Sequence, residues 1–135
     1  MYKRQNQYSA LDRKTVLVVE DISSNYLLIS AMLSKHYNLL HAVNGEQAVA
    51  MVKEYKIDLL LMDMKMPVMD GLTATAEIRK FDTNIPIVAL TAHAFESDKV
   101  AALKSGCNDY LVKPVDKARL MSVLRKYCHP STLVL

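Results

Sequence analysis

The sequence of 135 residues contains only three glycines and two cysteines, and it has no tryptophan. Its glycines form neither a G-x-x-x-x-G-K-[ST] nor a G-x-G-x-x-G motif, so the usual backbone cradle for a nucleotide is missing. The two cysteines, Cys107 and Cys128, lack the spacing of a metal site and are too few for a disulfide framework. We therefore expect two packed, free thiols and a reducing, cytoplasmic environment.

Long hydrophobic runs and a strong net charge are also missing. No apolar run approaches the ~18 residues of a membrane span, and the first residues are too polar for a signal peptide, so we expect a soluble domain without direct membrane contact. The net charge of +3 lies entirely in residues 1–14, which hold four basic side chains and one acidic one. The rest of the chain is neutral, which argues against nucleic-acid binding by this domain.

The pattern places one domain in the middle of the chain. Residues 1–14 are polar and aperiodic and are interpreted as a linker or leader, residues 15–128 as the domain, and residues 129–135 as a C-terminal tail. Inside the domain, short apolar runs rich in branched residues alternate with helical patterns. The predicted strands are 15–19, 37–43, 57–62, 85–90 and 107–112, and the predicted helices are about 23–35, 45–55, 72–80, 95–105 and 116–127.

This alternation predicts an α/β fold. The run at 57–62 has almost no polar interruption, which implies burial on both faces and therefore a parallel sheet covered by helices. Right-handed crossovers then give a doubly wound, three-layer (βα)₅ sandwich. The helices carry apolar stripes that we expect to face the core: Ala48, Met51, Val52 and Tyr55; Val100 and Leu103; Leu120, Val123 and Leu124.

Chemically active residues follow four of the predicted strands. Glu20 and Asp21 come directly after the first strand, Asp63 after the third, Thr91 after the fourth and Lys113 after the fifth. In an open parallel sheet the carboxyl ends of the strands share one edge, which is where ligands bind. The sequence therefore predicts that these residues meet in one crevice.

Three carboxylates in one crevice repel each other and favour a bound cation. Glu20, Asp21 and Asp63 offer only oxygen ligands, which predicts Mg²⁺ rather than zinc. A carboxylate in such a site can act as a nucleophile toward phosphorus, while the ammonium of Lys113 and the hydroxyl of Thr91 can bind the transferred oxygens. Without a nucleotide cradle, the phosphoryl group would come from a partner protein or a small reactive phosphodonor.

Ordinary structural roles compete with this interpretation. Asp21 and Thr91 could cap the helices that follow them, Asp63 could be a turn residue, and Lys113 could be a solvated charge. All four ordinary roles would have to hold at once, which is improbable. His36, His41, His93 and His129 lack paired ligand spacing and are interpreted as surface or packing residues, with only His93 near the site.

Four motifs together resemble the receiver domain of two-component response regulators. They are V-L-V-V-E-D at 16–21, D-M-K-M-P-V-M-D-G at 63–71, A-L-T-A at 89–92 and G-C-N-D-Y-L-V-K-P at 106–114. The resemblance runs from about residue 14 to residue 128 and implies a flavodoxin-like fold with strand order 2-1-3-4-5. The segments E-D-I-S-S-N-Y-L-L at 20–28 and L-T-A-H-A at 90–94 are most similar to the receivers of hybrid histidine kinases.

The resemblance implies that Asp63 accepts a phosphoryl group from a phosphohistidine in a Mg²⁺-dependent reaction. Asp21 would bind the metal directly and Glu20 through water, with Asp63 and the backbone carbonyl of Lys65 completing the protein ligands. Lys113 would bind the phosphoryl group. The phosphohistidine would belong to a histidine kinase or a histidine phosphotransfer domain.

The same resemblance assigns Thr91 and Tyr110 as the switch pair, although Tyr110 could equally be a half-buried strand aromatic. Lys65 and His93 would tune dephosphorylation, and Pro114 would follow a cis peptide bond. Switching would alter the surface formed by residues 95–105, 107–112 and 116–127, which could also support a homodimer.

Two other functions remain open at this stage. A pseudo-receiver would keep the fold as an interaction module without chemistry. A phosphatase of the haloacid dehalogenase type would also use a strand-end Asp with Mg²⁺, but it usually has a second acid where this chain has Lys65. In the receiver interpretation the domain catalyses only its own phosphorylation and dephosphorylation, and its parent could be a membrane-anchored hybrid kinase with this domain at its cytoplasmic end.

Overall fold

The computed structural model describes residues 13–130, which form five strands and five helices in strict alternation. The strands are β1 (Thr15–Val19), β2 (Asn38–Ala42), β3 (Leu59–Asp63), β4 (Ile87–Thr91) and β5 (Asp109–Val112). The helices are α2 (Ser23–Leu33), α3 (Gly45–Glu54), α4 (Gly71–Arg79), α5 (Glu96–Ser105) and α6 (Lys117–Tyr127).

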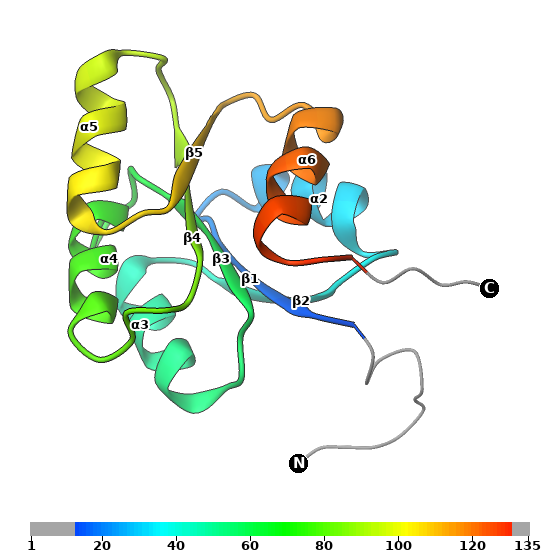
Figure 1. Ribbon diagram of the computed structural model, residues 1–135, viewed down its shortest axis with the longest axis horizontal. Helices are drawn as coiled ribbons and strands as arrows, with labels where there is room; N and C mark the ends of the chain where they lie inside the picture. The colour runs from blue at the N-terminus through cyan, green and yellow to red at the C-terminus, as the bar shows by residue number, and fades with distance from the viewer. Residues whose placement is uncertain (1–12, 131–135) are drawn as a thin grey trace.

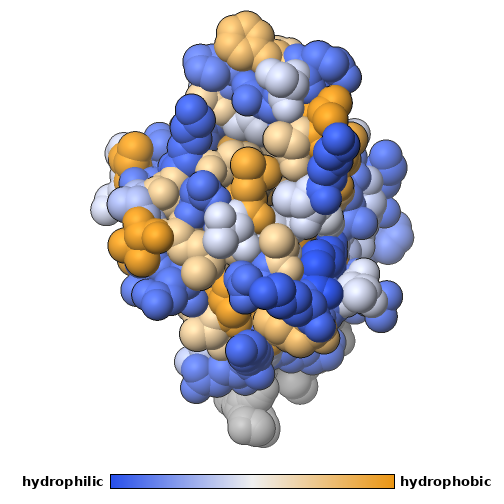
Figure 2. Space-filling model, turned by 90° about the vertical axis from the view of Figure 1, so that its left-hand side faces the viewer, coloured by the Kyte–Doolittle hydropathy of each residue, from blue (hydrophilic) through white to orange (hydrophobic). Residues whose placement is uncertain are grey.

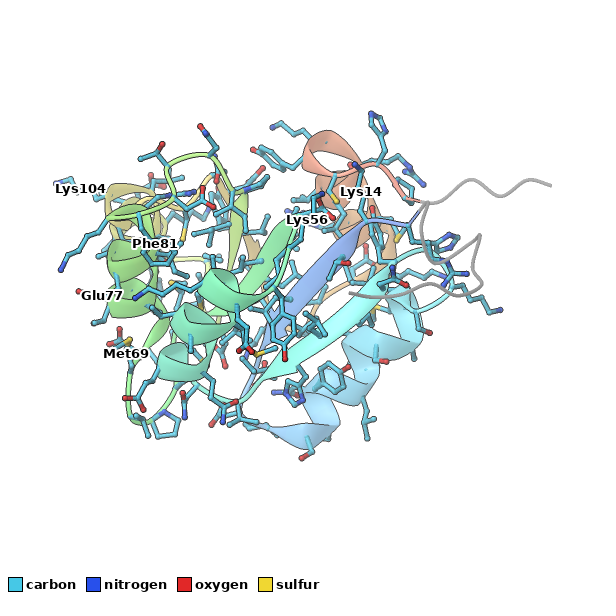
Figure 3. The ribbon with its side chains drawn as sticks, turned by 90° about the horizontal axis from the view of Figure 1, so that it is seen from below. Lys14, Lys56, Met69, Glu77, Phe81 and Lys104 are labelled. Atoms are coloured by element: carbon cyan, nitrogen blue, oxygen red, sulfur yellow. The ribbon has the colours of Figure 1, made fainter. Side chains whose placement is uncertain are left out.

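All strand pairs are parallel, in the order β2-β1-β3-β4-β5, which confirms the predicted doubly wound fold. The chain order reverses between β1 and β3, so the crevice at the carboxyl ends of these two central strands is where a ligand is expected. Figure 3 shows the direction of the sheet: Lys14 and Lys56 precede β1 and β3, and Met69, in the loop after β3, lies toward the opposite end.

Helices cover both faces of the sheet, with α2 and α6 on one side and α3, α4 and α5 on the other (Figure 1). Each side has its own core because neighbouring strand residues point to opposite faces. Val16 and Val18 pack with α2 and α6, whereas Leu17 and Val19 pack with the three other helices. The central strands β1, β3 and β4 are buried on both faces, as their continuous apolar runs predict.

The apolar stripe predicted for α5 is wrong. Val100 and Leu103 are 40% and 48% exposed, and Ala102 is the buried residue of this helix. A small side chain on the inner face lets α5 approach the sheet closely, so the larger apolar residues point outward. Tyr55 is also exposed, whereas Ala48, Leu120 and Leu124 are buried as expected.

Four predicted strands begin one or two residues too early. Tyr37 and Cys107 are buried, but they lie in the turns before β2 and β5 rather than in paired strands. The backbone N–H of each bonds to the preceding helix, from Tyr37 to Leu33 and from Cys107 to Ala102. An apolar residue that packs under a helix end looks like a strand residue in a one-dimensional pattern.

Glycine allows the loop after β3 to lie close to its neighbours. A Cβ on Gly71 would collide with the backbone carbonyl oxygen of Asp63 and would lie 2.6 Å from Cε of Met64. The side chain of Asp70 caps α4 by accepting a hydrogen bond from the N–H of Thr73 at 2.8 Å. The start of α4 is therefore fixed directly beside the end of β3.

In the part of the chain that the structure describes, the longest helices fall short of a membrane span.

Candidate functional site

The structure brings the predicted site residues together at the carboxyl ends of the central strands. Asp63 and Thr91 are the last residues of β3 and β4, Glu20 follows β1, and Lys113 follows β5. Glu20, Asp63 and Thr91 are almost completely buried, with exposures of 0%, 4% and 3%. Buried polar residues at the ends of apolar strands need partners, and at this edge they lie close to one another.

Three carboxylates form the acidic cluster Glu20, Asp21 and Asp63. One ligand oxygen from each lies within 4.8 Å of the other two. Oδ1 of Asp21 is buried and has no hydrogen-bond partner among the described residues. An orphaned, buried carboxylate oxygen beside two further carboxylates fits a hard divalent cation, because such an ion would satisfy the oxygen and reduce the repulsion.

Lys113 supplies the positive charge opposite the acidic cluster. Its Nζ lies 3.1 Å from Oε1 of Glu20 and 3.1 Å from Oδ2 of Asp63. Burial on its own lowers the pKa of Lys113, but the hydrogen bonds and negative charges of Asp63 and Glu20 outweigh it and raise the pKa above its usual value. Lys113 is therefore a permanent cation with its head group held at the phosphoacceptor candidate.

Glu20 is held by groups that sequence reasoning did not identify. Its Oε2 accepts hydrogen bonds from the backbone N–H of Ile22 at 3.3 Å and from Nδ2 of Asn25 at 3.4 Å. Its backbone carbonyl lies 2.8 Å from Nε2 of His41, whose ring stacks on Tyr26 at 3.8 Å. Asn25 lies in α2 and His41 in β2, so no local pattern in the sequence could have linked them to the site.

Asp63 is positioned by the loop that follows it. Its Oδ1 accepts a hydrogen bond from the backbone N–H of Lys65 at 3.1 Å, and Lys65 itself is exposed. Further along the loop, Val68 has a φ of 71°, an uncommon value for a β-branched residue. The N–H of Met69 bonds to the carbonyl of Pro67 at 2.8 Å across this residue, which closes a tight turn.

The hydroxyl of Thr91 is bonded to the loop that follows β4. Oγ1 donates to the backbone carbonyl of His93 at 2.9 Å. Tyr110, the predicted switch partner, is partly buried, and Nζ of Lys99 lies 5.0 Å from the centre of its ring. His93 is exposed, its ring stacks on Phe95 with 5.0 Å between centroids, and its backbone carbonyl accepts the hydroxyl of Thr91.

Most of the ordinary roles considered for these residues do not describe the structure. The N-cap residue of α2 is Ile22 rather than Asp21, and that of α5 is Phe95 rather than Thr91. Lys113 is ion-paired instead of solvated. Asp63 ends β3, and its bond to the N–H of Lys65 also gives it the contact of a turn residue. The peptide bond between Lys113 and Pro114 is cis. Both cysteines are free and buried, as predicted.

The geometry defines what the site can do chemically. It combines a nearly buried carboxylate, two further acids suited to a hard cation, and an ammonium 3.1 Å from the first carboxylate. A hydroxyl close by can turn toward a group attached to Asp63. These are the parts required to accept and hold a phosphoryl group.

Comparisons with known proteins agree with this arrangement. Residues 16–125 match the family model described as response regulator receiver domain. The chain is 40% identical over 119 residues to hybrid signal transduction histidine kinase M of Dictyostelium discoideum, covering 82% of this chain and 5% of that protein. It is 42% identical over 118 residues to the sensor histidine kinase GacS of Pseudomonas protegens, covering 83% of this chain and 13% of that protein.

Two solved structures are similar in both sequence and fold. The receiver domain of sensor histidine kinase PA1611 from Pseudomonas aeruginosa, which has a magnesium ion coordinated in its active-site cleft, is 39% identical with a TM-score of 0.79, covering 85% of this chain and 97% of that chain. The receiver domain of Ssk1 from Saccharomyces cerevisiae, crystallised with the histidine phosphotransfer protein Ypd1, is 36% identical with a TM-score of 0.82, covering 86% and 89%. The chain spans only 5% and 13% of the two curated relatives named above, so the similarity concerns one domain of larger proteins.

Proposed function

Because the chain belongs to the response regulator receiver family, a family of two-component signal transduction, we propose that Asp63 is its phosphoacceptor. The main supporting observation is that Asp63 is only 4% exposed and lies in one crevice with Glu20, Asp21 and Lys113. We propose residues 15–128 as the receiver domain, with residues 1–14 and 129–135 outside it. Beyond its own phosphorylation and dephosphorylation, the domain has no catalytic activity in this proposal.

The acidic cluster is proposed to bind Mg²⁺ when the domain reacts. Asp21 and Asp63 would provide direct carboxylate ligands, Glu20 would act through water, and the backbone carbonyl of Lys65 would complete the protein's share. The unpartnered Oδ1 of Asp21 and the all-oxygen donor set support this assignment, as does the magnesium ion in the receiver of PA1611. Bound Mg²⁺ would offset the negative charges of the carboxylates and of the incoming phosphoryl group.

In the transfer itself, an oxygen of Asp63 attacks phosphorus and the bond from phosphorus to the donor breaks. Lys113 stays charged throughout, because its pKa is raised by the two carboxylates that it contacts. It can therefore move from its ion pair with Asp63 to an oxygen of the new phosphoryl group without any proton transfer. Burial excludes bulk water and strengthens this contact.

Thr91 is proposed to convert phosphorylation into a conformational change. Its hydroxyl would leave the carbonyl of His93 and donate to a phosphoryl oxygen instead. A hydrogen bond to a charged group contributes about 1.5–3 kcal/mol, so Thr91 and Lys113 together supply about 3–6 kcal/mol. That is comparable to the ~5.5 kcal/mol that moves a two-state equilibrium from 1:99 to 99:1.

The movement of Thr91 would leave space for Tyr110 to turn inward. This rotation would change the surface formed by α5, β5 and α6, which we propose as the output face and as a surface for homodimer formation. Lys65 and His93, on the loops beside Asp63, would tune the rate of dephosphorylation.

The phosphoryl donor is proposed to be a phosphohistidine on a histidine kinase or a histidine phosphotransfer protein. Ile22, Leu27 and Leu28 of α2 and the turn before it are all more than half exposed, and Leu28 lines a small hollow that also contains Glu20 and Pro114. An exposed apolar rim beside a charged site suits protein docking. The complex of the Ssk1 receiver with Ypd1 supports a partner of this class. We propose a cytoplasmic location, within a chain that could be a hybrid kinase.

Incubation with acetyl phosphate and Mg²⁺ tests the proposal. Wild type is expected to gain one phosphoryl group by intact mass, and Asp63→Asn is expected to gain none. Equal labelling of the two proteins would show that Asp63 is not the acceptor. Failure of wild type to bind Mg²⁺ or to become labelled would favour an interaction module without chemistry, and turnover of p-nitrophenyl phosphate would favour a phosphatase.

A further inference from the structure

A pocket of about 320 Å³ lies beside the phosphoacceptor, between the ends of β3 and β4 and the first turns of α4 and α5. Its volume is at the lower end of the range for small-molecule sites. Its lining residues come from the two loops that follow Asp63 and Thr91 and from the two helices: Met64, Lys65, Met66, Asp70, Leu72, Thr91, Ala92, His93, Asp98 and Ala101. We call it the α4–α5 pocket.

The α4–α5 pocket adjoins the reaction site through residues next to Asp63. Lys65 and Thr91 line the pocket, and both also adjoin Asp63: the backbone N–H of Lys65 donates to Oδ1 of Asp63, and Thr91 ends the strand next to β3. Met64, the residue after Asp63, lines the pocket as well. A molecule with its phosphorus at Asp63 can therefore extend into the pocket.

The lining indicates which kind of molecule fits. Half of the lining residues are apolar, namely Met64, Met66, Leu72, Ala92 and Ala101. Methionine side chains adapt to irregular ligand shapes. Lys65 and His93 provide positive or neutral groups next to the reaction site, whereas Asp70 and Asp98 add two carboxylates. One oxygen of Asp70 already accepts the N–H of Thr73, so it serves as a cap rather than as a free ligand. The two acids disfavour an anionic body.

A small molecule fits this part of the surface better than a protein. Figure 2 shows the face that carries α4 and α5, where hydrophobic residues are separated by hydrophilic ones. Its exposed apolar side chains include Phe81, Phe95, Val100 and Leu103, and none of these lines the pocket. A protein interface normally has a contiguous apolar centre.

We propose that the α4–α5 pocket holds the acyl group of a small acyl phosphate and thereby selects donors with a short, uncharged, apolar acyl chain. This inference rests on the proposed role of Asp63 as phosphoacceptor. An oxygen of Asp63 attacks phosphorus, the bond between phosphorus and the acyl oxygen breaks, and the carboxylate departs with the electron pair. The departing carboxylate would leave into the pocket that Lys65 lines. Reaction with a small donor then depends on the acyl chain as well as on the phosphoryl group.

The first experiment compares acetyl phosphate with butyryl phosphate, whose leaving groups have nearly equal basicity. Phosphorylation rates per unit donor concentration are measured by intact mass with Mg²⁺. Burial of two further methylene groups predicts that wild type reacts about tenfold faster with butyryl phosphate. Ala101→Leu fills the pocket and is expected to abolish this preference, so that the two donors react at similar rates.

Ala76→Leu is the matched control, because Ala76 is exposed on α4 and does not line the pocket. It should retain the preference for butyryl phosphate. Urea denaturation of Ala101→Leu and Ala76→Leu checks that both variants are folded.

The second experiment examines charge with benzoyl phosphate and 4-carboxybenzoyl phosphate. Wild type is expected to react at least about fivefold more slowly with the carboxylated donor, because Asp70 and Asp98 repel its tail. Asp98→Asn is expected to reduce the ratio of the two rates. Added salt should reduce it too.

Equal rates of wild type with acetyl and butyryl phosphate would overturn the inference, as would a preference that survives in Ala101→Leu. So would a discrimination between the two benzoyl donors that Asp98→Asn does not alter. In each of these outcomes Asp63 is still phosphorylated, so the proposed function stands. If no donor labels wild type, the proposed function fails, and the inference fails with it.

Discussion

At the scale of single residues, the site balances opposite charges on side chains that are largely buried. The acidic cluster Glu20, Asp21 and Asp63 faces one ammonium, that of Lys113, within the described part of the chain. At an effective dielectric of about 20, each pair of carboxylates at this separation repels by roughly 3–4 kcal/mol. The protein thus holds unfavourable electrostatic energy that a cation relieves.

Lys113→Met is expected to reduce the free energy of unfolding by about 1–3 kcal/mol in metal-free buffer at pH 8. The substitution leaves the buried carboxylates without their ammonium, although partial solvent access moderates the loss. Mg²⁺ should restore part of the lost stability. Urea denaturation with and without Mg²⁺ measures both effects, with the exposed Lys117→Met as control. A loss that is the same in both buffers would contradict the charge balance.

Cys128 is expected to make the protein sensitive to alkaline pH. Burial, helped by the charge of Asp58, raises the pKa of its thiol from 9.0 to about 11, with Lys14 and Lys56 acting in the opposite direction. In the unfolded chain the thiol ionises from about pH 9, whereas in the folded protein it stays neutral until about pH 11. The contribution of the neutral thiol to the free energy of unfolding is therefore complete below pH 9 and is lost as the pH rises to 11.

Wild type should lose about 2 kcal/mol more stability than Cys128→Ala between pH 8 and pH 11, under reducing conditions. Urea denaturation at several pH values gives the dependence of the unfolding free energy on pH for wild type and for Cys128→Ala. Cys107→Ala should also lose less stability than wild type, because burial raises the pKa of that thiol too. Parallel pH profiles for wild type and Cys128→Ala would rule out this role of Cys128.

At the scale of elements, the junction between β3 and α4 determines how well Asp63 is placed. Gly71→Ala would force the start of α4 away from the carbonyl of Asp63 and from Met64. A shift of about 1 Å at a reacting group can reduce a rate by up to about a hundredfold, so we expect a ten- to hundredfold slower reaction with acetyl phosphate. Intact-mass time courses measure the rate.

Gly106→Ala is the matched control for this variant. Gly106 has a φ of 118°, and a Cβ there would lie 2.7 Å from Cγ of Arg79, so the substitution should destabilise the fold by about 1–3 kcal/mol. It lies at the end of α5 remote from the acidic cluster, at the opposite edge of the sheet from Asp63. If Gly106→Ala slows phosphorylation as much as Gly71→Ala, the effect reflects stability rather than position.

At the scale of the whole molecule, metal binding and folding are coupled, since only the folded chain gathers the three acids. A ligand at a hundred times its Kd stabilises the folded state by about 2.7 kcal/mol. For a domain of this size, saturating Mg²⁺ should raise Tm by about 10 °C, and EDTA should reverse the rise. Differential scanning calorimetry measures this shift. The Asp21→Asn variant should lose most of the rise in Tm. If NaCl of matched ionic strength raised the Tm of wild type equally, the effect would be a non-specific salt effect.

The sequence by itself determined the fold class, the strand order implied by the family resemblance, and the residues that meet at the sheet edge. It could do so because short, branched apolar runs specify buried parallel strands, and parallel strands deliver the residues at their carboxyl ends to one place. Glu20, Asp63, Thr91 and Lys113 were therefore predictable as neighbours. Their roles in phosphorylation remain predictions that the experiments above address.

Only the tertiary structure decided how those side chains point and what supports them. The support of Glu20 by Asn25 and His41, the contact of Thr91 with the carbonyl of His93, and the α4–α5 pocket all join segments that are separate elements or loops. The outward position of Val100 likewise depends on how closely α5 approaches the sheet. Rotamers and cavities are set by packing between distant parts of the chain, and a one-dimensional pattern carries no information about that packing.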